Sequence, residues 1–144
     1  MKKSMKIARN LLQVYSAKCK PLCQEIGMPQ TAFDILMFLA NNPECNTARD
    51  IVEIRNIKAN LVSINVEKLV KEGYLSRNQS LGDRRKTLLA CTDKAQPIVE
   101  KGRLLQEGFR EELFRNVDES SRANFFHVME ILEANLKDMQ EGRD

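Results

Sequence analysis

The stretch from residue 81 to residue 86 constrains this chain more than any other. It reads Leu-Gly-Asp-Arg-Arg-Lys, and it places a glycine turn and three consecutive cations between two segments of β character, 74–77 and 87–91. An amphipathic helix is expected just before it. A hairpin tip with this much positive charge suits a polyanion better than a protein interior, and we expect that polyanion to be DNA.

Charge is distributed unevenly along the chain. Residues 1–103 carry 18 Lys and Arg against 10 Asp and Glu, whereas residues 104–144 carry 5 against 10. The net charge of +3 is too small to indicate nucleic acid by itself. The asymmetry suggests a basic working face and a separate acidic helical end, although ordinary solvated helix faces are the alternative. A chain of 144 residues fits one domain with a helical appendage.

The N-terminal residues are positively charged, but polar residues interrupt the apolar ones that follow. Neither a signal peptide nor a membrane span is therefore expected. The four cysteines show no CxxC spacing, which indicates reduced thiols in a cytoplasmic protein. They are Cys19, Cys23, Cys45 and Cys91.

Apolar periodicity predicts six helices around the hairpin. The first covers about 4–24, the second begins at Pro29 and ends at 41–43, and the third is a short helix that begins at Thr47. The fourth covers 58–72. The fifth is capped by Thr92 and Asp93 and reaches about Arg115, and the sixth is capped by Asp118. Pro21 should kink or shorten the first helix, and Pro97 should make the start of the fifth irregular. Thr47 and Asp50 have the spacing of a capping box.

The helix over 58–72 has two different faces. Its buried face is expected to consist of Val62, Val66, Leu69 and Val70. Its opposite face presents Lys58, Asn60, Ser63, Asn65 and Lys68. A face of short polar side chains fits the major groove of B-DNA, about 12 Å wide, and a hairpin beside it can reach the minor groove, where arginine is favoured. This order of elements predicts a winged helix-turn-helix.

The first, fifth and sixth helices carry apolar stripes that so small a core cannot cover. A second copy of the chain is the natural partner for them, and a two-fold dimer would place two recognition helices about one turn of DNA apart. We therefore predict a mainly α fold with a small β-hairpin wing and flanking dimerisation helices. Its parts would be an N-terminal dimerisation helix (1–28), a winged helix-turn-helix lobe (29–92) and C-terminal dimerisation helices (93–144).

On these residues the chain resembles the MarR family of transcription regulators. The stretch from Asp83 to Ala95, DRRKTLLACTDKA, is similar to the family's wing signature D-R-R-x-x-x-L-x-L-T-x-x-G. Residues 47–75 look like its helix-turn-helix, ending in the pattern of Leu69, Gly73, Tyr74 and Leu75. Cys91 stands where the family usually has leucine, and Ala95 where it usually has glycine.

The resemblance implies a homodimer that represses or activates at a pseudo-palindromic promoter site. It also implies that a small aromatic or anionic effector, or cysteine oxidation, changes the affinity for DNA. By position, Asp83 would hold the wing arginines in place, and Arg84 or Arg85 would enter the minor groove. Arg77 is expected to pair with Asp83 or to touch a phosphate. The expected DNA-binding residues are Lys58, Asn60, Ser63, Asn65, Lys68, Arg84, Arg85 and Lys86. An effector pocket could be lined by Tyr15, Phe33, Met37 and Phe109, with core packing as the alternative for each.

Two other functions are left open. One is a winged-helix module that binds a protein partner, and the other is a thiol-based redox sensor using Cys19 and Cys23, although their i, i+4 spacing is poor for a disulfide. His127 is the only histidine, so a metal site is not expected. Without a nucleophile–base pair or a phosphate-binding glycine loop, neither catalysis nor a cofactor is expected.

Overall fold

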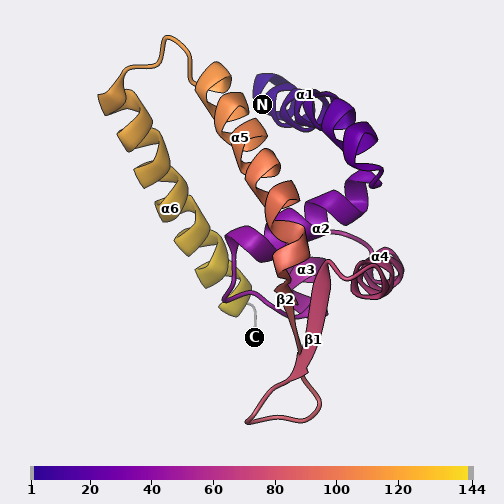
Figure 1. Cartoon of the computed structure of the whole chain (residues 1–144). Helices are drawn as coiled ribbons and strands as arrows, with labels where there is room; N and C mark the ends of the chain where they lie inside the picture. Colours follow the sequence, from indigo (N-terminus) through magenta and orange to yellow (C-terminus); the bar gives the residue numbers. More distant parts are fainter. Residues whose placement is uncertain (1, 143–144) are drawn as a thin grey trace. The chain divides into compact units, whose positions relative to one another are not determined.

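The computed structural model describes residues 2–142 as helices and one hairpin (Figure 1). The elements are α1 (Lys2–Ile26), α2 (Gln30–Asn41), α3 (Ala48–Arg55), α4 (Ala59–Lys71), β1 (Leu75–Gln79), β2 (Thr87–Cys91), the 3₁₀ turn η1 (Asp93–Ala95), α5 (Gln96–Leu113) and α6 (Glu119–Glu141). The predicted fold class, mainly α with a β-hairpin wing, is confirmed. Two compact units make up the chain, unit 1 up to Phe109 and unit 2 from Arg110.

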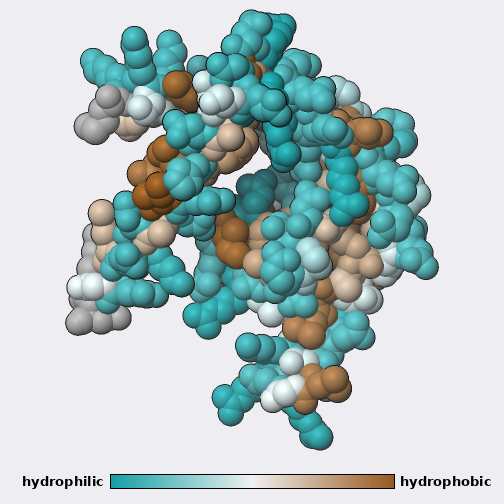
Figure 2. All heavy atoms as spheres, turned by 90° about the vertical axis from the view of Figure 1, so that its left-hand side faces the viewer, coloured by the Kyte–Doolittle hydropathy of each residue, from teal (hydrophilic) through white to brown (hydrophobic). Residues whose placement is uncertain are grey.

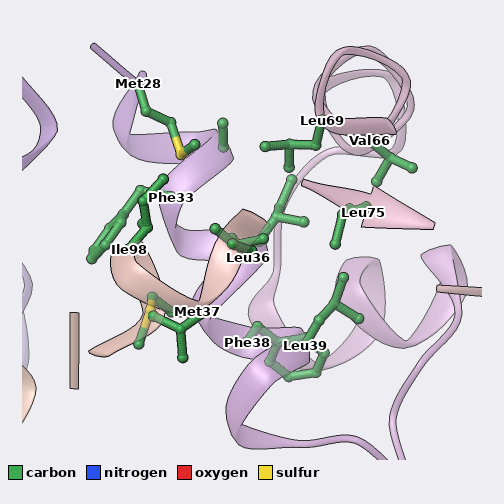
Figure 3. Packing of buried hydrophobic residues seen from close by; sticks show 14 of the residues in the cluster. Met28, Phe33, Leu36, Met37, Phe38, Leu39, Val66, Leu69, Leu75 and Ile98 are labelled. Atoms are coloured by element: carbon green, nitrogen blue, oxygen red, sulfur yellow. The ribbon is translucent and has the colours of Figure 1, made fainter. Parts of the chain in front are cut away.

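Helix α2 is the centre of the core of unit 1, as its almost wholly apolar sequence predicts. Seven of its 12 residues are buried, and side chains from α1, α3, α4, β1, β2 and α5 pack around them. Figure 3 shows Phe33, Leu36 and Met37 of α2 among neighbours that include Leu69 and Ile98. Burial of each large apolar side chain contributes about 1.5–3 kcal/mol, so α2 organises the elements that carry the hairpin.

Local sequence signals set the limits of the helix-turn-helix. The hydroxyl of Thr47 accepts a hydrogen bond from the backbone N–H of Asp50 at 3.1 Å, and the Asp50 carboxylate accepts one from the N–H of Thr47 at 3.2 Å. The predicted capping box is thereby confirmed. Asn56, with a φ of 55°, turns the chain between α3 and α4, and Gly73, with a φ of 85°, ends the helical region of α4.

The hairpin packs against the core and is hydrogen-bonded to the loop before α3. Its strands are antiparallel, with Leu75 opposite Cys91, and Leu75 and Leu89 are buried in the core. The N–H of Leu89 donates to the carbonyl oxygen of Asn46 at 2.7 Å. The loop before α3 therefore lies along β2, and the connection between the strands projects away from the helices of unit 1 (Figure 1).

The structure corrects two local predictions. Pro21 does not shorten α1, which continues to Ile26, because a proline so near a helix end removes only one late backbone hydrogen bond. Thr92 does not cap α5, since its hydroxyl donates to the carbonyl oxygen of Gly73 instead. The irregular start expected near Pro97 is confirmed, because the turn η1 comes directly before α5.

Unit 2 consists of the end of α5 and the helix α6. The carboxylate of Asp118 accepts the N–H of Ser121 at 2.6 Å and caps α6 as predicted. None of the residues of α6, all of which the structure describes, is buried. Its apolar stripe is 42–60% exposed and consists of Phe125, Val128, Met129, Leu132, Leu136 and Met139.

Candidate nucleic-acid interface

Helix α4 turns a largely polar face away from the core. At about 100° per residue, Asn60, Ile64 and Glu67 lie on one stripe, opposite the buried Val62 and Val66. All three side chains are exposed. This outer stripe (Asn60, Ile64 and Glu67) is the part of α4 that a DNA groove would meet.

The five predicted DNA-binding residues of α4 and its N-cap differ in how free their side chains are. Four are exposed, namely Lys58 at the N-cap, Asn60, Ser63 and Lys68. Asn65 is half-buried, and its side-chain amide donates to the carbonyl oxygen of Leu61 at 2.8 Å. Asn65 is thus held against its own helix, on a flank and not on the outer stripe.

A groove of about 680 Å³ lies between α3, α4 and the hairpin. Most of its lining is apolar, and its polar residues are Arg49 and Glu53, which are paired at 2.8 Å, together with Ser63, Arg77 and Thr87. The groove is therefore an apolar hollow with polar residues from α3, α4 and both strands of the hairpin. Guanidinium and hydroxyl groups commonly donate hydrogen bonds to the phosphate oxygens of DNA.

The wing tip (residues 80–86) is a turn with a fixed backbone. The N–H of Ser80 donates to the carbonyl oxygen of Lys86, and the N–H of Lys86 to that of Asp83, both at 3.1 Å. The Asp83 carboxylate accepts the backbone N–H of Arg85 at 3.0 Å. All side chains of the tip except that of Ser80 are exposed, and Figure 2 shows hydrophilic groups dominating the projecting end. The turn thus presents its three cations to solvent.

Arg77 on β1 reaches α4 and not the wing tip. Its guanidinium Nη2 lies 2.8 Å from Oε2 of Glu67. A pair with Asp83 is therefore not formed, and the hydrogen bond that Asp83 accepts comes from the backbone of Arg85. Sequence reasoning missed Glu67, although its spacing of seven residues from Asn60 places it on the outer stripe and could have revealed it.

The entry to α5 is bound to the end of α4. The hydroxyl of Thr92 donates to the carbonyl oxygen of Gly73 at 2.5 Å, and the ammonium of Lys94 donates to that of Glu72 at 2.6 Å. The same ammonium lies 4.6 Å from the centre of the Tyr74 ring. These donors satisfy carbonyl groups that the end of a helix leaves without partners.

The four residues predicted to line an effector pocket are of two kinds. Phe33 and Met37 are buried in the core, whereas the rings of Tyr15 and Phe109 are in contact, with centroids 5.3 Å apart. A cavity of about 160 Å³ borders two of these residues. It is lined by Tyr15, Asp34, Met37, Phe38, Asn41, Asn42, Arg55 and Gln106.

Asp34 and Arg55 supply the charges of this cavity, and their side chains are 3.3 Å apart. Burial raises the pKa of Asp34, and the Arg55 guanidinium opposes that rise. Burial also raises the pKa of Tyr15 to about 12, against the effect of the hydrogen bond that its oxygen accepts from Gln106. The Arg55 guanidinium is paired with Asp34, and the side-chain amides of Asn41, Asn42 and Gln106 donate to neighbouring oxygens. A polar ligand would therefore have to replace some of these partners.

The cysteines are free thiols. Cys19 and Cys23 are buried, and burial raises the pKa of both thiols, that of Cys23 to about 11. Burial likewise raises the pKa of Cys91. Within residues 2–142, no group of three His, Cys, Asp or Glu side chains is placed to hold a metal ion. Nor does any described helix have the length and apolar character that crossing a membrane requires.

Comparison with known proteins agrees with this geometry. Residues 26–86 match the model of the MarR family. A helix-turn-helix transcriptional regulator of Bacillus subtilis, YdgJ, is 25% identical over 114 residues, which cover 79% of this chain and 69% of the relative. The resemblance to the MarR family is thereby confirmed.

Solved structures show the same fold. A MarR transcriptional regulator from Methanosarcina mazei superposes with a TM-score of 0.77 at 20% identity, covering 96% of this chain and 99% of that one. A putative MarR-family regulator from Listeria monocytogenes, solved with a 26mer DNA, gives 0.74 at 19% identity, with 95% and 88% covered. Bordetella bronchiseptica BpsR, whose DNA binding is regulated by 6-hydroxynicotinic acid, gives 0.67 at 18% identity, with 91% and 98% covered.

Proposed function

Residues 26–86 form a winged helix-turn-helix of the MarR family of transcription regulators, and from this premise we propose that the chain represses transcription by binding a pseudo-palindromic promoter site as a homodimer. In each half-site, α4 would lie in the major groove and the wing tip in the adjacent minor groove. The Listeria monocytogenes protein of the same fold, solved with a 26mer DNA, supports DNA as the partner.

One observation carries the proposal: three exposed cations stand on a fixed turn beside the polar face of α4. The Asp83 carboxylate accepts the backbone N–H of Arg85, and this hydrogen bond helps to hold the turn that carries the cations. Phosphate contacts would set the position of the protein, and base contacts would set its sequence preference. The proposed contacts are Lys58, Asn60, Ser63, Lys68, Arg84, Arg85 and Lys86. Asn65 can join them only after its side-chain amide breaks the hydrogen bond to the carbonyl oxygen of Leu61.

The homodimer is supported by apolar residues that the chain leaves uncovered. On α1, Ile7, Leu12 and Val14 are about half exposed or more, and the stripe of α6 is also uncovered. Large apolar side chains left exposed on a helix mark association sites, and α1 and α6 each carry such residues. We assign these sites to a second copy, because a symmetric dimer places two α4 helices on one palindromic site.

Effector control is assigned to the cavity beside Tyr15 and Arg55. Arg55 would bind the anionic group of a small aromatic molecule in place of Asp34, and the regulation of BpsR by 6-hydroxynicotinic acid supports a ligand of that class. A redox switch at Cys19 and Cys23 is less well supported, because burial raises the pKa of both thiols and leaves little of the reactive thiolate.

Fluorescence anisotropy tests the function directly. The protein is titrated into a labelled duplex from the region upstream of its gene and into a scrambled duplex of the same length, at two salt concentrations. Specific regulators bind their site about 10³-fold or more tightly than other DNA. Equal affinity for both duplexes, lost at the higher salt, would contradict the proposal and favour the protein-binding module.

A further inference from the structure

An ion pair between Glu67 and Arg77 joins the recognition helix to the wing. The two groups are 2.8 Å apart, the length of a strong charge-assisted hydrogen bond. The Glu67 side chain is nevertheless 71% exposed and that of Arg77 40% exposed. Ion pairs this exposed contribute little to the free energy of folding. Stabilisation of the fold therefore does not explain why this pair is present.

Arg77 lies where the proposed complex would place a DNA backbone. It lines the groove between α3, α4 and the hairpin together with Arg49, Ser63 and Thr87. In the free protein, the Glu67 carboxylate binds the guanidinium group of Arg77, as a phosphate group would in the complex. A phosphate and Glu67 therefore compete for the same cation.

Glu67 also belongs to the outer stripe of α4, with Asn60 and Ile64. A carboxylate on this face is repelled by DNA phosphates unless it finds a hydrogen-bond donor on a base. In the major groove, the N4 amino group of cytosine is the donor that carboxylates accept from.

We propose that Glu67 is a specificity determinant that releases Arg77 to a phosphate where the major groove offers a cytosine amino group. This inference rests on the proposed DNA binding. At a site with that cytosine, Glu67 exchanges Arg77 for the cytosine amino group, and Arg77 exchanges Glu67 for a phosphate. At other sequences, the same movement of Arg77 leaves Glu67 unpaired among phosphates, which lowers the affinity.

The variant Glu67→Gln tests this inference by anisotropy titration on the specific and the scrambled duplex. It should bind scrambled DNA more tightly than the wild type does, and its ratio of specific to non-specific affinity should fall at least about fivefold, the low end of what one base contact supplies. Selection from randomised duplexes should show that Glu67→Gln replaces a cytosine preference at one position of each half-site by a preference for adenine, whose N6 and N7 a glutamine amide pairs with.

Glu25→Gln is the matched control. Glu25 on α1 pairs with Lys101 at 2.9 Å, with side chains 62% and 51% exposed, so this variant removes the same charge from a comparable ion pair. Its affinity ratio should equal that of the wild type. A Glu67→Gln protein that keeps the wild-type ratio and cytosine preference, or two variants that change the ratio equally, would overturn the inference. A wild type without any sequence preference would overturn the proposed function instead.

Discussion

The backbone of Gly102 packs directly against the side chain of Met37, where α5 meets α2. A Cβ on Gly102 would lie 2.8 Å from Cε of Met37 and 3.2 Å from Cε2 of Phe33, and closer still to the Met37 sulfur. A glycine inside a helix costs about 1 kcal/mol relative to alanine. At this position the close approach of two helices offsets that cost, which helix propensity alone does not reveal.

Gly102→Ala should therefore destabilise the protein, although it improves helix propensity. We expect a loss of about 1–3 kcal/mol in the free energy of unfolding, because Met37 and Phe33 must shift in a packed core. Gly108→Ala is the control in the same helix, since no described atom lies within 4 Å of its added Cβ. It should gain about 0.5–1 kcal/mol. Urea denaturation measures both, and a loss of the same size at the two positions would contradict the packing argument.

Thr47→Ala should lower the free energy of unfolding by about 1 kcal/mol, because it removes the hydroxyl that accepts the N–H of Asp50. Thr47→Ser keeps that acceptor and should stay close to the wild type. Thermal unfolding followed by circular dichroism measures the difference. Equal melting temperatures for the two variants would show that the capping box does not stabilise α3.

Arg85→Ala should weaken binding to promoter DNA and reduce the slope of log affinity against log salt by about 0.9, the value of one phosphate contact. Lys20→Ala removes an exposed charge from α1 and serves as the control for net charge. Anisotropy titrations at several salt concentrations give both slopes. The same change in slope for the two variants would exclude a specific role of the wing.

Asp83→Ala and Asp83→Asn should have different effects on DNA binding. The alanine variant loses the acceptor for the backbone N–H of Arg85 and should bind promoter DNA several-fold more weakly, since a solvent-exposed hydrogen bond of this kind is worth about 1 kcal/mol. The asparagine variant keeps an acceptor oxygen and removes a negative charge near the phosphates, so its affinity should at least equal that of the wild type. If both variants weaken binding equally, the charge of Asp83 and not the turn is what matters.

Asp34 should make stability depend on pH. Burial raises its pKa in the folded state above the ordinary value of 3.8, so the folded protein binds the proton more tightly than the unfolded chain does. The stability that this proton contributes is fully present below about pH 3.8 and is lost as the pH rises through the folded-state pKa. Relative to Asp34→Asn, the wild type should gain stability between pH 7 and pH 4. Urea denaturation of both proteins at the two pH values measures this gain, and a constant difference would contradict it.

Much of the fold could be predicted because its signals are local. Apolar periodicity predicted six helices, and the capping box at Thr47 followed from the spacing of two residues, Thr47 and Asp50. The hydroxyl of Thr92 was assigned wrongly because its partner, Gly73, is brought close only by the hairpin. Tertiary proximity of this kind has no local signal.

The candidate site shows the same limit. The exposed wing cations could be predicted from composition, whereas the partner of Arg77 could not, because Asp83 and Glu67 were both carboxylates at plausible distances along the chain. Register and helix phase decide between them, and they place Arg77 beside α4. The bond between Asn65 and Leu61 was likewise invisible in the spacing of polar residues.

The two hydrogen bonds from Thr92 and Lys94 connect the start of α5 to the end of α4. Ile98 and Val99 of α5 are also buried in the core, so a displacement of the start of α5 would shift the core and the last turn of α4 together. A movement of α5 would therefore reach the proposed DNA-binding face of α4 through these two hydrogen bonds.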